Sequence, residues 1–457
     1  MKIKFHNPFK LLILFFFTTF LIWPAIYNGY PLVFSDSGTY IIAGYINEIP
    51  IDRPIFYSLF VKLMSLSYSL WLVVFAQSLM VSFVIYMLVR KFISSNVILL
   101  SIGLISILSF TTGLSNYASQ IMPDILCAIP FIGIAIIITT ETMKWKEYVL
   151  SLIIIFCSMT NFSFLLVLLG IGFVIVILSL FRMIKYKMLY RTLVISILPI
   201  FIVLVVNKSY TGKFQISKAG NVFILARMIE TGIVKQYLDE NCHVKNYKFC
   251  DQLNKLSGSS AQFLWDEKSV LYDDKCLSSG WGSCWEEKND EFGKIASDIA
   301  TTSKYSKQLL SIYLKDFFRQ IIDFKIGILI PMRENTSPQY CINEKFRNEM
   351  KFYKNSNQYK KALEFKTMSL IQLIFVAFSG IGLILILLFY KLKIKREHNI
   401  IIIILGFGFI GNAMSVVLFS TEVDRYQSRI IWIIPLIALL MFYRYIVEKR
   451  NAKSNSL

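Results

Sequence analysis

Long apolar runs recur along most of this chain, and they constrain its fold more than any other feature. Runs of 18 or more residues are long enough to cross the roughly 30 Å hydrocarbon core of a membrane as helices. The 457 residues are 55% hydrophobic and only 17% charged, whereas about a quarter of a soluble domain is charged. The runs do not alternate in the segments of about ten residues that barrel strands show. The sequence therefore predicts an all-α polytopic membrane protein.

About ten membrane spans are expected from the lengths of these runs. Their approximate limits are 11–28, 70–89, 94–113, 122–140, 147–160, 163–181, 191–207, 368–390, 399–418 and 429–447. The first follows three lysines and resembles a signal peptide, but no small-residue cleavage site follows it, so we expect an uncleaved span. These limits divide the chain into a seven-span module (1–207), a large hydrophilic segment (208–367) and three C-terminal spans (368–457).

The basic residues between the spans indicate the orientation of the chain. With the N-terminus inside, 19 Lys and Arg residues flank the inner ends of the spans, against four in the short outer loops. Inner loops are enriched in Lys and Arg, so both termini are expected in the cytoplasm. The same bias explains most of the net charge of +19, and nucleic acid is not expected as a partner. The richness in Ile, Lys, Phe and Asn suggests an AT-rich bacterial genome, and we expect the chain in the bacterial inner (cytoplasmic) membrane.

The segment 208–367 is then expected outside the membrane, as a mostly helical domain between spans seven and eight. It contains five of the seven cysteines. Two spacings of eight residues suggest the disulfides Cys242–Cys250 and Cys276–Cys284, although four cysteines allow three pairings. Zinc is the competing interpretation, but the segment has no C-x-x-C pair.

Two stretches of this segment have clear helical periodicity, Val222 to Leu238 and Ser303 to Phe324. The second combines an apolar face with Lys307, Lys315 and Arg319, so we expect it along the membrane surface or under the outer domain. Ile326 to Pro331 extends its apolar run toward the bilayer.

The first outer loop, about residues 29–69, contains the most conspicuous polar group outside the large segment. Asp36 lies at the membrane surface, followed by Tyr40 and by Asp52 and Arg53. Amphipathic helices are expected around Tyr40–Tyr45 and Ile55–Met64. Ionisable groups at membrane depth are costly and are functional candidates by default. The structural alternative is that Asp36 only caps the helix that starts near Ser37.

Two later outer loops contain further candidates. Asp124 follows Pro123 at the outer end of the fourth span, where its alternative role is to begin the helix. Before the last span, Arg425 and Arg429 lie four residues apart with Tyr426 between them, a spacing that favours one helix face. Arginine forks suit a phosphate. The alternative is local salt bridges to Glu422 and Asp424.

Together these features resemble the GT-C superfamily of integral membrane glycosyltransferases. The likeness is carried by Asp36 in a long first outer loop, Pro123-Asp124 in the second, and the Arg425-Tyr426-x-x-Arg429 pattern at a late span. The arrangement of about seven spans, a large outer region and further spans is also similar. Ser37 stands where many members have a second acidic residue.

The resemblance implies transfer of a sugar from a polyprenyl-phosphate carrier to a glycan, lipid or protein acceptor outside the membrane. Asp36 would be the general base, and Arg425 with Arg429 would neutralise the leaving phosphate. Asp124 would orient substrate hydroxyls, while the first-loop wall and substrate contacts would involve Tyr40, Asp52, Arg53 and Tyr426. A divalent cation is compatible with this class, and no metal ligand is predicted.

Two other classes compete with this interpretation. Lipid-linked glycan polymerases and O-antigen ligases also combine many spans with a large outer loop, and their chemistry depends on Arg and His residues there. The only His in this outer segment is His243, beside Cys242. A lipid or glycan transporter would show charges within its spans and repeat symmetry, and neither is evident in the sequence.

Overall fold

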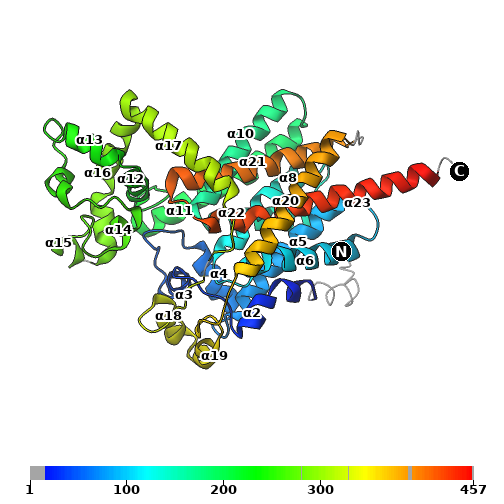
Figure 1. Ribbon diagram of the computed structural model, residues 1–457, viewed down its shortest axis with the longest axis horizontal. Coiled ribbons are helices and arrows are strands. Elements are labelled where there is room, and N and C mark those ends of the chain that lie inside the picture. Colours follow the sequence, from blue (N-terminus) through cyan, green and yellow to red (C-terminus); the bar gives the residue numbers. More distant parts are fainter. Residues whose placement is uncertain (1–15, 279, 328, 390–393, 455–457) are drawn as a thin grey trace.

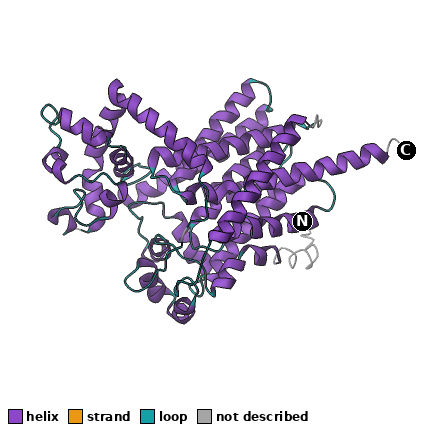
Figure 2. Ribbon diagram, viewed as in Figure 1, coloured by secondary structure: helices purple, strands orange, loops and turns teal. Residues whose placement is uncertain are grey.

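The computed structural model describes residues 16–278, 280–327, 329–389 and 394–454, and these consist of helices joined by loops (Figure 2). Within these ranges the only strand-like pairing is one isolated parallel bridge between Leu32 and Gln120. The prediction of an all-α chain is confirmed for these residues.

Six helices in the described part of the chain are long and apolar enough to cross a membrane. They are α5 (Trp71–Phe92), α10 (Phe162–Leu180), α11 (Tyr186–Thr211), α20 (Lys366–Phe389), α21 (Arg396–Phe419), and the continuous pair α22 (Asp424–Ile431) and α23 (Ile433–Ser454). In Figure 1 these helices run side by side in a bundle, with α23 extending from one end and the helices α12–α16 at the other.

The remaining expected spans correspond to shorter helices. The stretches 94–113 and 147–160 contain α6 (Val97–Thr111) and α9 (Trp145–Met159), and 122–140 contains η1 (Pro123–Cys127) followed by α8 (Ala128–Ile138). A helix of 15 residues is only about 22 Å long. Of the first expected span, residues 11–15 lie outside the described residues; the rest is helical on both sides of a break at Ile22, before α2 (Trp23–Asn28).

Helix α8 lies at the centre of the bundle, because every one of its residues is buried. A helix that is apolar all round must be covered on all sides, and α8 packs against α5, α9, α10, α11 and α21. The approach of α21 is so close that a Cβ added at Gly408 would lie 2.8 Å from the ring of Phe131. This central position fixes Asp124, in η1, at the end of the bundle nearest the helices α12–α16.

The helices beyond α11 form a unit with its own hydrophobic core. They are α12 (Gly220–Glu230), α13 (Ile233–Asn241), η2 (Lys248–Lys255), α14 (Ser260–Trp265), α15 (Asp274–Leu277) and α16 (Trp281–Thr301), called the α12–α16 unit below. Helix α17 (Ser303–Ile322) packs on α13 and α16 of this unit. Buried aromatic residues, among them Phe263, Trp285 and Phe292, fill the space between them. The expected helix over Ser303–Phe324 is confirmed, whereas Val222–Leu238 is broken into α12 and α13 at Gly232, whose φ of 78° interrupts a helix.

Two disulfides close eight-residue loops in this unit, Cys242–Cys250 and Cys276–Cys284. The pairing suggested by the spacing is therefore confirmed. The other three cysteines, Cys127, Cys157 and Cys341, are buried and free.

The end of the hydrophilic segment packs on the first loop instead of on this unit. Helix α18 (Ser337–Lys345) lies against α3 (Ser37–Ile46), which also packs on α4 (Phe56–Ser65), while η3 (Arg347–Glu349) and α19 (Met350–Asn355) follow α18. The buried carboxylate of Glu349 accepts hydrogen bonds from the Tyr30 hydroxyl at 2.7 Å and the Ser69 hydroxyl at 2.5 Å. Glu349 thereby ties together the two ends of the first loop, on either side of α3 and α4.

Candidate functional site

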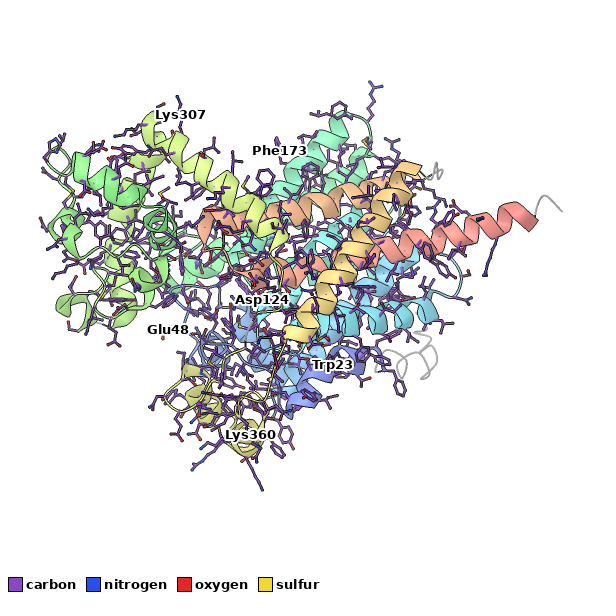
Figure 3. The ribbon with its side chains drawn as sticks, viewed as in Figure 1. Trp23, Glu48, Asp124, Phe173, Lys307 and Lys360 are labelled. Carbon is purple, nitrogen blue, oxygen red and sulfur yellow. A yellow bond between two sulfur atoms is a disulfide. The ribbon has the colours of Figure 1, made fainter. Side chains whose placement is uncertain are left out.

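A cavity of about 1310 Å³ lies where the first loop, the α12–α16 unit and the loop before α22 meet. The first loop contributes Asp36, Asp52 and Arg53 to its wall, and the segment before α22 contributes Arg425 and Tyr426. The opposite wall includes Lys218, Trp265, Ser283 and Glu286. In Figure 3 the labelled Glu48 belongs to the cavity wall, and the labelled Asp124 lies deeper, within the bundle.

Backbone contacts bring the first and second loops of this region together. The N–H of Leu32 donates to the carbonyl of Ser119, and the N–H of Ile121 donates to the carbonyl of Leu32, both at 2.9 Å. The fully buried Ser37 hydroxyl donates to the carbonyl of Ile121 at 2.9 Å and accepts from the N–H of Phe34 at 2.8 Å. Ser37 therefore fastens the loop that presents Asp36, and its side chain does not face the cavity.

Asp36 occupies the N-cap position of α3, but its carboxylate makes no capping hydrogen bond. One oxygen lies 3.4 Å from Nη2 of Arg53 and the other 3.9 Å from Nη2 of Arg425. Both distances exceed those of close charge-assisted hydrogen bonds, about 2.7–2.9 Å. The side chain keeps 29% of its surface exposed. The carboxylate is therefore paired loosely and stays accessible from the cavity.

Arg53 is fixed by its neighbours in the first loop. Its Nε donates to the carboxylate of Asp52 at 3.0 Å, and its Nη2 contacts the same oxygen. The guanidinium lies 4.8 Å from the ring centre of Tyr40, at cation–π distance. Burial raises the pKa of the Tyr40 phenol, so this ring remains neutral. Asp52 and Tyr40 thus hold Arg53 toward Asp36.

Arg425 is the most unusual group in the cavity wall. Its Nη2 faces Asp36, and its Nε lies 3.8 Å from Oδ2 of Asp124, but Nε and Nη1 are buried and have no hydrogen-bond partner among the described residues. The rings of Phe34 and Tyr426 flank the guanidinium at 4.2 and 5.1 Å. An arginine held in place with unused donors is suited to bind an anion.

Behind Arg425, an interior ion pair joins two helices of the bundle. Nη1 of Arg429 donates to Oδ1 of Asp124 at 2.9 Å, and Nη2 donates to Oδ1 of Asn412 at 2.9 Å. Arg429 is 1% exposed and Asp124 is 2% exposed. Asp124 thus interacts with both arginines, which lie on one face of α22 as their spacing indicates.

A second set of charges surrounds Glu422, which lies in the loop between α21 and α22 and also lines the cavity. Glu422 lies 3.9 Å from Nη2 of Arg227 and 3.7 Å from Nη1 of Arg319. Burial, reinforced by a hydrogen bond and repulsion from the carboxyl of Asp316, raises the pKa of Glu422 to about 7. The expectation of local salt bridges from Arg425 and Arg429 to Glu422 and Asp424 is wrong, because both arginines pair with Asp36 or Asp124 instead.

No group of three or more His, Cys, Asp or Glu side chains that could hold a metal ion occurs among the described residues. Asp36, Asp52 and Asp124 each face an arginine within 4 Å. The site residues are thus arranged as carboxylate–guanidinium pairs.

The structure brings all of the sequence-derived candidates into one connected cluster. Asp36, Asp52, Arg53, Arg425 and Tyr426 line the cavity. The other three support this wall from behind: Tyr40 lies under Arg53, and Asp124 and Arg429 lie behind Arg425.

Sequence reasoning missed several participants. Asn412 bonds Arg429, and a lone amide inside an apolar span is a signal that points to such a role. Phe34, Lys218 and Trp265 had no distinguishing signal, because only tertiary packing brings them to the cavity.

Comparison of the chain with protein-family models, with curated proteins and with solved structures gave no match.

Proposed function

We propose that this chain is a membrane glycosyltransferase that moves a sugar from a polyprenyl-phosphate donor to an acceptor on the outer face of the membrane. The observation that carries the proposal is the pairing of Asp36 and Arg425 on one cavity wall. A loosely paired carboxylate lies 3.9 Å from a guanidinium that retains two unused donors. This combination offers a proton acceptor and an anion site side by side.

Each group has a defined part in the reaction. The carboxylate of Asp36 accepts the proton of the acceptor hydroxyl as its oxygen bonds to the anomeric carbon of the sugar. The bond from that carbon to the phosphate oxygen breaks, and the electron pair leaves with the polyprenyl phosphate. Arg425 stabilises the charge that develops on this phosphate. Attack from the face opposite the leaving group inverts the anomeric centre.

The surrounding residues support these two groups. Arg53, held by Asp52 and Tyr40, limits the positions of Asp36, while Asp124 and Arg429 orient Arg425. The cavity of about 1310 Å³ exceeds the roughly 300–1,000 Å³ of common small-molecule pockets, which is consistent with two substrates bound together.

The proposal includes the topology of the chain. In this proposal the chain crosses a bacterial inner membrane ten times, both termini lie in the cytoplasm, and residues 208–367 lie outside. The basic residues at the inner ends of the spans support this orientation. The candidate site lies at the same end of the bundle as the α12–α16 unit, as a reaction with lipid-linked donors outside the membrane requires.

The test compares lipid-linked sugars and surface glycans by mass spectrometry in cells with and without the protein. We expect cells without it to lack one sugar on a surface glycan and to accumulate the corresponding lipid-linked sugar. The wild type and the control Asp239→Asn, an exposed acid in α13, restore the sugar, whereas Asp36→Asn does not although it inserts equally well. Restoration by Asp36→Asn would refute the proposal. A change in glycan chain length in place of one lost sugar would indicate a polymerase or ligase.

A further inference from the structure

Helix α17 exposes a row of large apolar side chains that no other described segment covers. Leu310, Leu314, Phe318 and Ile322 are 59%, 45%, 64% and 72% exposed. Residues four apart lie on the same face of a helix, so these four form one stripe along α17. The stripe is separate from the face that packs on the protein, where Tyr305, Leu309, Tyr313 and Gln320 are buried.

A third face of the same helix is basic. Lys315 and Arg319 are exposed beside the apolar stripe, Lys304 and Lys307 are exposed in the first turns of the helix before the stripe begins, and Lys325 follows the end of the helix. A helix with a buried face, an apolar exposed face and a basic flank resembles the helices that lie in a membrane interface. Large exposed apolar patches are rare on surfaces that face water.

The C-terminal half of α17 lies beside the segment that joins the membrane-crossing helices α21 and α22. The side-chain amide of Gln320 donates to the carbonyl of Val423 at 3.1 Å, just after α21, and Arg319 lies 3.7 Å from Glu422. In Figure 1, α17 slopes from the far side of the α12–α16 unit toward the ends of α21 and α22. Phe318 and Ile322 therefore lie close to the ends of these helices.

The apolar stripe continues toward the exposed apolar surface of α20, one of the six candidate membrane spans. Ile322 also borders a groove of about 500 Å³ between the segment after α17 and the start of α20, where Leu370 and Leu373 form the facing wall. These two leucines are 56% and 50% exposed, and the membrane-crossing stretch of α20 is only 11% buried within the protein. The end of α17 and the start of α20 therefore border the same exposed groove.

We propose that α17 is an interfacial helix that docks the α12–α16 unit on the outer leaflet of the membrane. The C-terminal part of the stripe, Leu314, Phe318 and Ile322, enters the boundary between headgroups and acyl chains, and Lys315 and Arg319 lie beside anionic headgroups. Because α16 packs on α17 and contributes Ser283 and Glu286 to the cavity, this docking holds the cavity wall opposite Asp36 at a fixed height above the membrane. The inference does not depend on the reaction that occurs in the cavity.

The test places a fluorophore on α17 in single-copy nanodiscs. A cysteine introduced by Leu314→Cys or Phe318→Cys is labelled with an environment-sensitive dye, and quenching of the dye by spin-labelled lipids is measured. The matched control is Gln308→Cys, an exposed polar position on the same helix. The native free cysteines are buried and do not compete for the label. We expect quenching at the first two positions to exceed that at the control position by about threefold or more, and to increase with anionic lipid.

Equal, weak quenching at all three positions would overturn the inference and assign the stripe to a protein partner or a second copy of the chain. Cross-linking between two Phe318→Cys chains in nanodiscs that hold two copies would identify the second copy. The same labelled chain carrying Asp36→Asn should be quenched as the parent is. Loss of lipid quenching therefore refutes the docking, whereas full transfer activity of Asp36→Asn refutes the proposed reaction.

Discussion

The buried pair between Asp124 and Arg429 should behave as a structural support of the cavity, and its removal should be measurable as a large loss of stability. Replacing Asp124 by Asn leaves Arg429 as a buried cation, 1% exposed, that has lost a partner at 2.9 Å, and also removes the charge 3.8 Å from Nε of Arg425. Coulomb's law with an effective dielectric constant near 20 gives about 6 kcal/mol for charges at this separation. Desolvation offsets much of that, and breaking a buried pair typically costs about 3–5 kcal/mol.

We therefore expect Asp124→Asn to lower the free energy of unfolding by about 3–5 kcal/mol, measured by SDS-driven unfolding in mixed micelles. The double variant Asp124→Leu, Arg429→Met removes both charges and should recover most of this loss, leaving about 1–2 kcal/mol because Oδ1 of Asn412 loses the hydrogen bond from Arg429. The control Asp239→Asn breaks an exposed pair with Lys235 and should cost less than about 1 kcal/mol. If Asp124→Asn is as stable as the wild type, Asp124 does not support Arg425, and the reasoning about the cavity wall fails.

Two further predictions follow from the neighbouring groups. Replacing Arg425 by Gln should slow transfer by about 10²–10³-fold, as the loss of one preorganised donor to a developing oxyanion does. Replacing it by Lys should preserve part of the rate, because the charge remains but the planar fork is missing. An unchanged rate in Arg425→Gln would exclude Arg425 from the phosphate site. The pKa of Glu422 in the folded protein is raised to about 7 from an ordinary value near 4.5, so its contribution to stability is present below pH 4.5 and is lost as the pH rises through 7. Glu422→Gln should therefore gain stability relative to the wild type as the pH rises from 5 to 8. A difference in stability that does not change with pH would contradict burial as the cause of the shift.

The helical, membrane-crossing character of the chain was predictable because hydropathy requires no knowledge of tertiary contacts. The lengths of the individual spans were less predictable. Helix α6 ends at Thr111 before Gly113, and α9 ends before Asn161, whose side chain caps α10 by accepting from the N–H of Ser163 at 2.9 Å. These local signals shorten helices inside apolar runs that hydropathy alone reads as full spans.

The candidate site could be predicted as a set of residues but not as a geometry. Acidic and basic groups on the same side of a membrane are few, so Asp36, Asp124 and Arg425 stood out. Their pairing depends on contacts between distant parts of the chain, such as the approach of α18 to α3, where a Cβ on Gly38 would overlap the hydroxyl of Ser337. Hydrophobic pattern and charge do not encode contacts between segments so far apart in the sequence. The opposite wall with Trp265 was unpredictable for the same reason.

The central claim is that Asp36 removes the proton of the acceptor. It is tested most directly by single-turnover transfer in proteoliposomes, with the lipid-linked donor that accumulates in cells lacking the protein. The account predicts that Asp36→Asn transfers about 10²–10⁴-fold more slowly than the wild type while binding the donor equally well, because only the proton acceptor is lost. A rate equal to that of the wild type, in a variant that is stably inserted, would contradict the account.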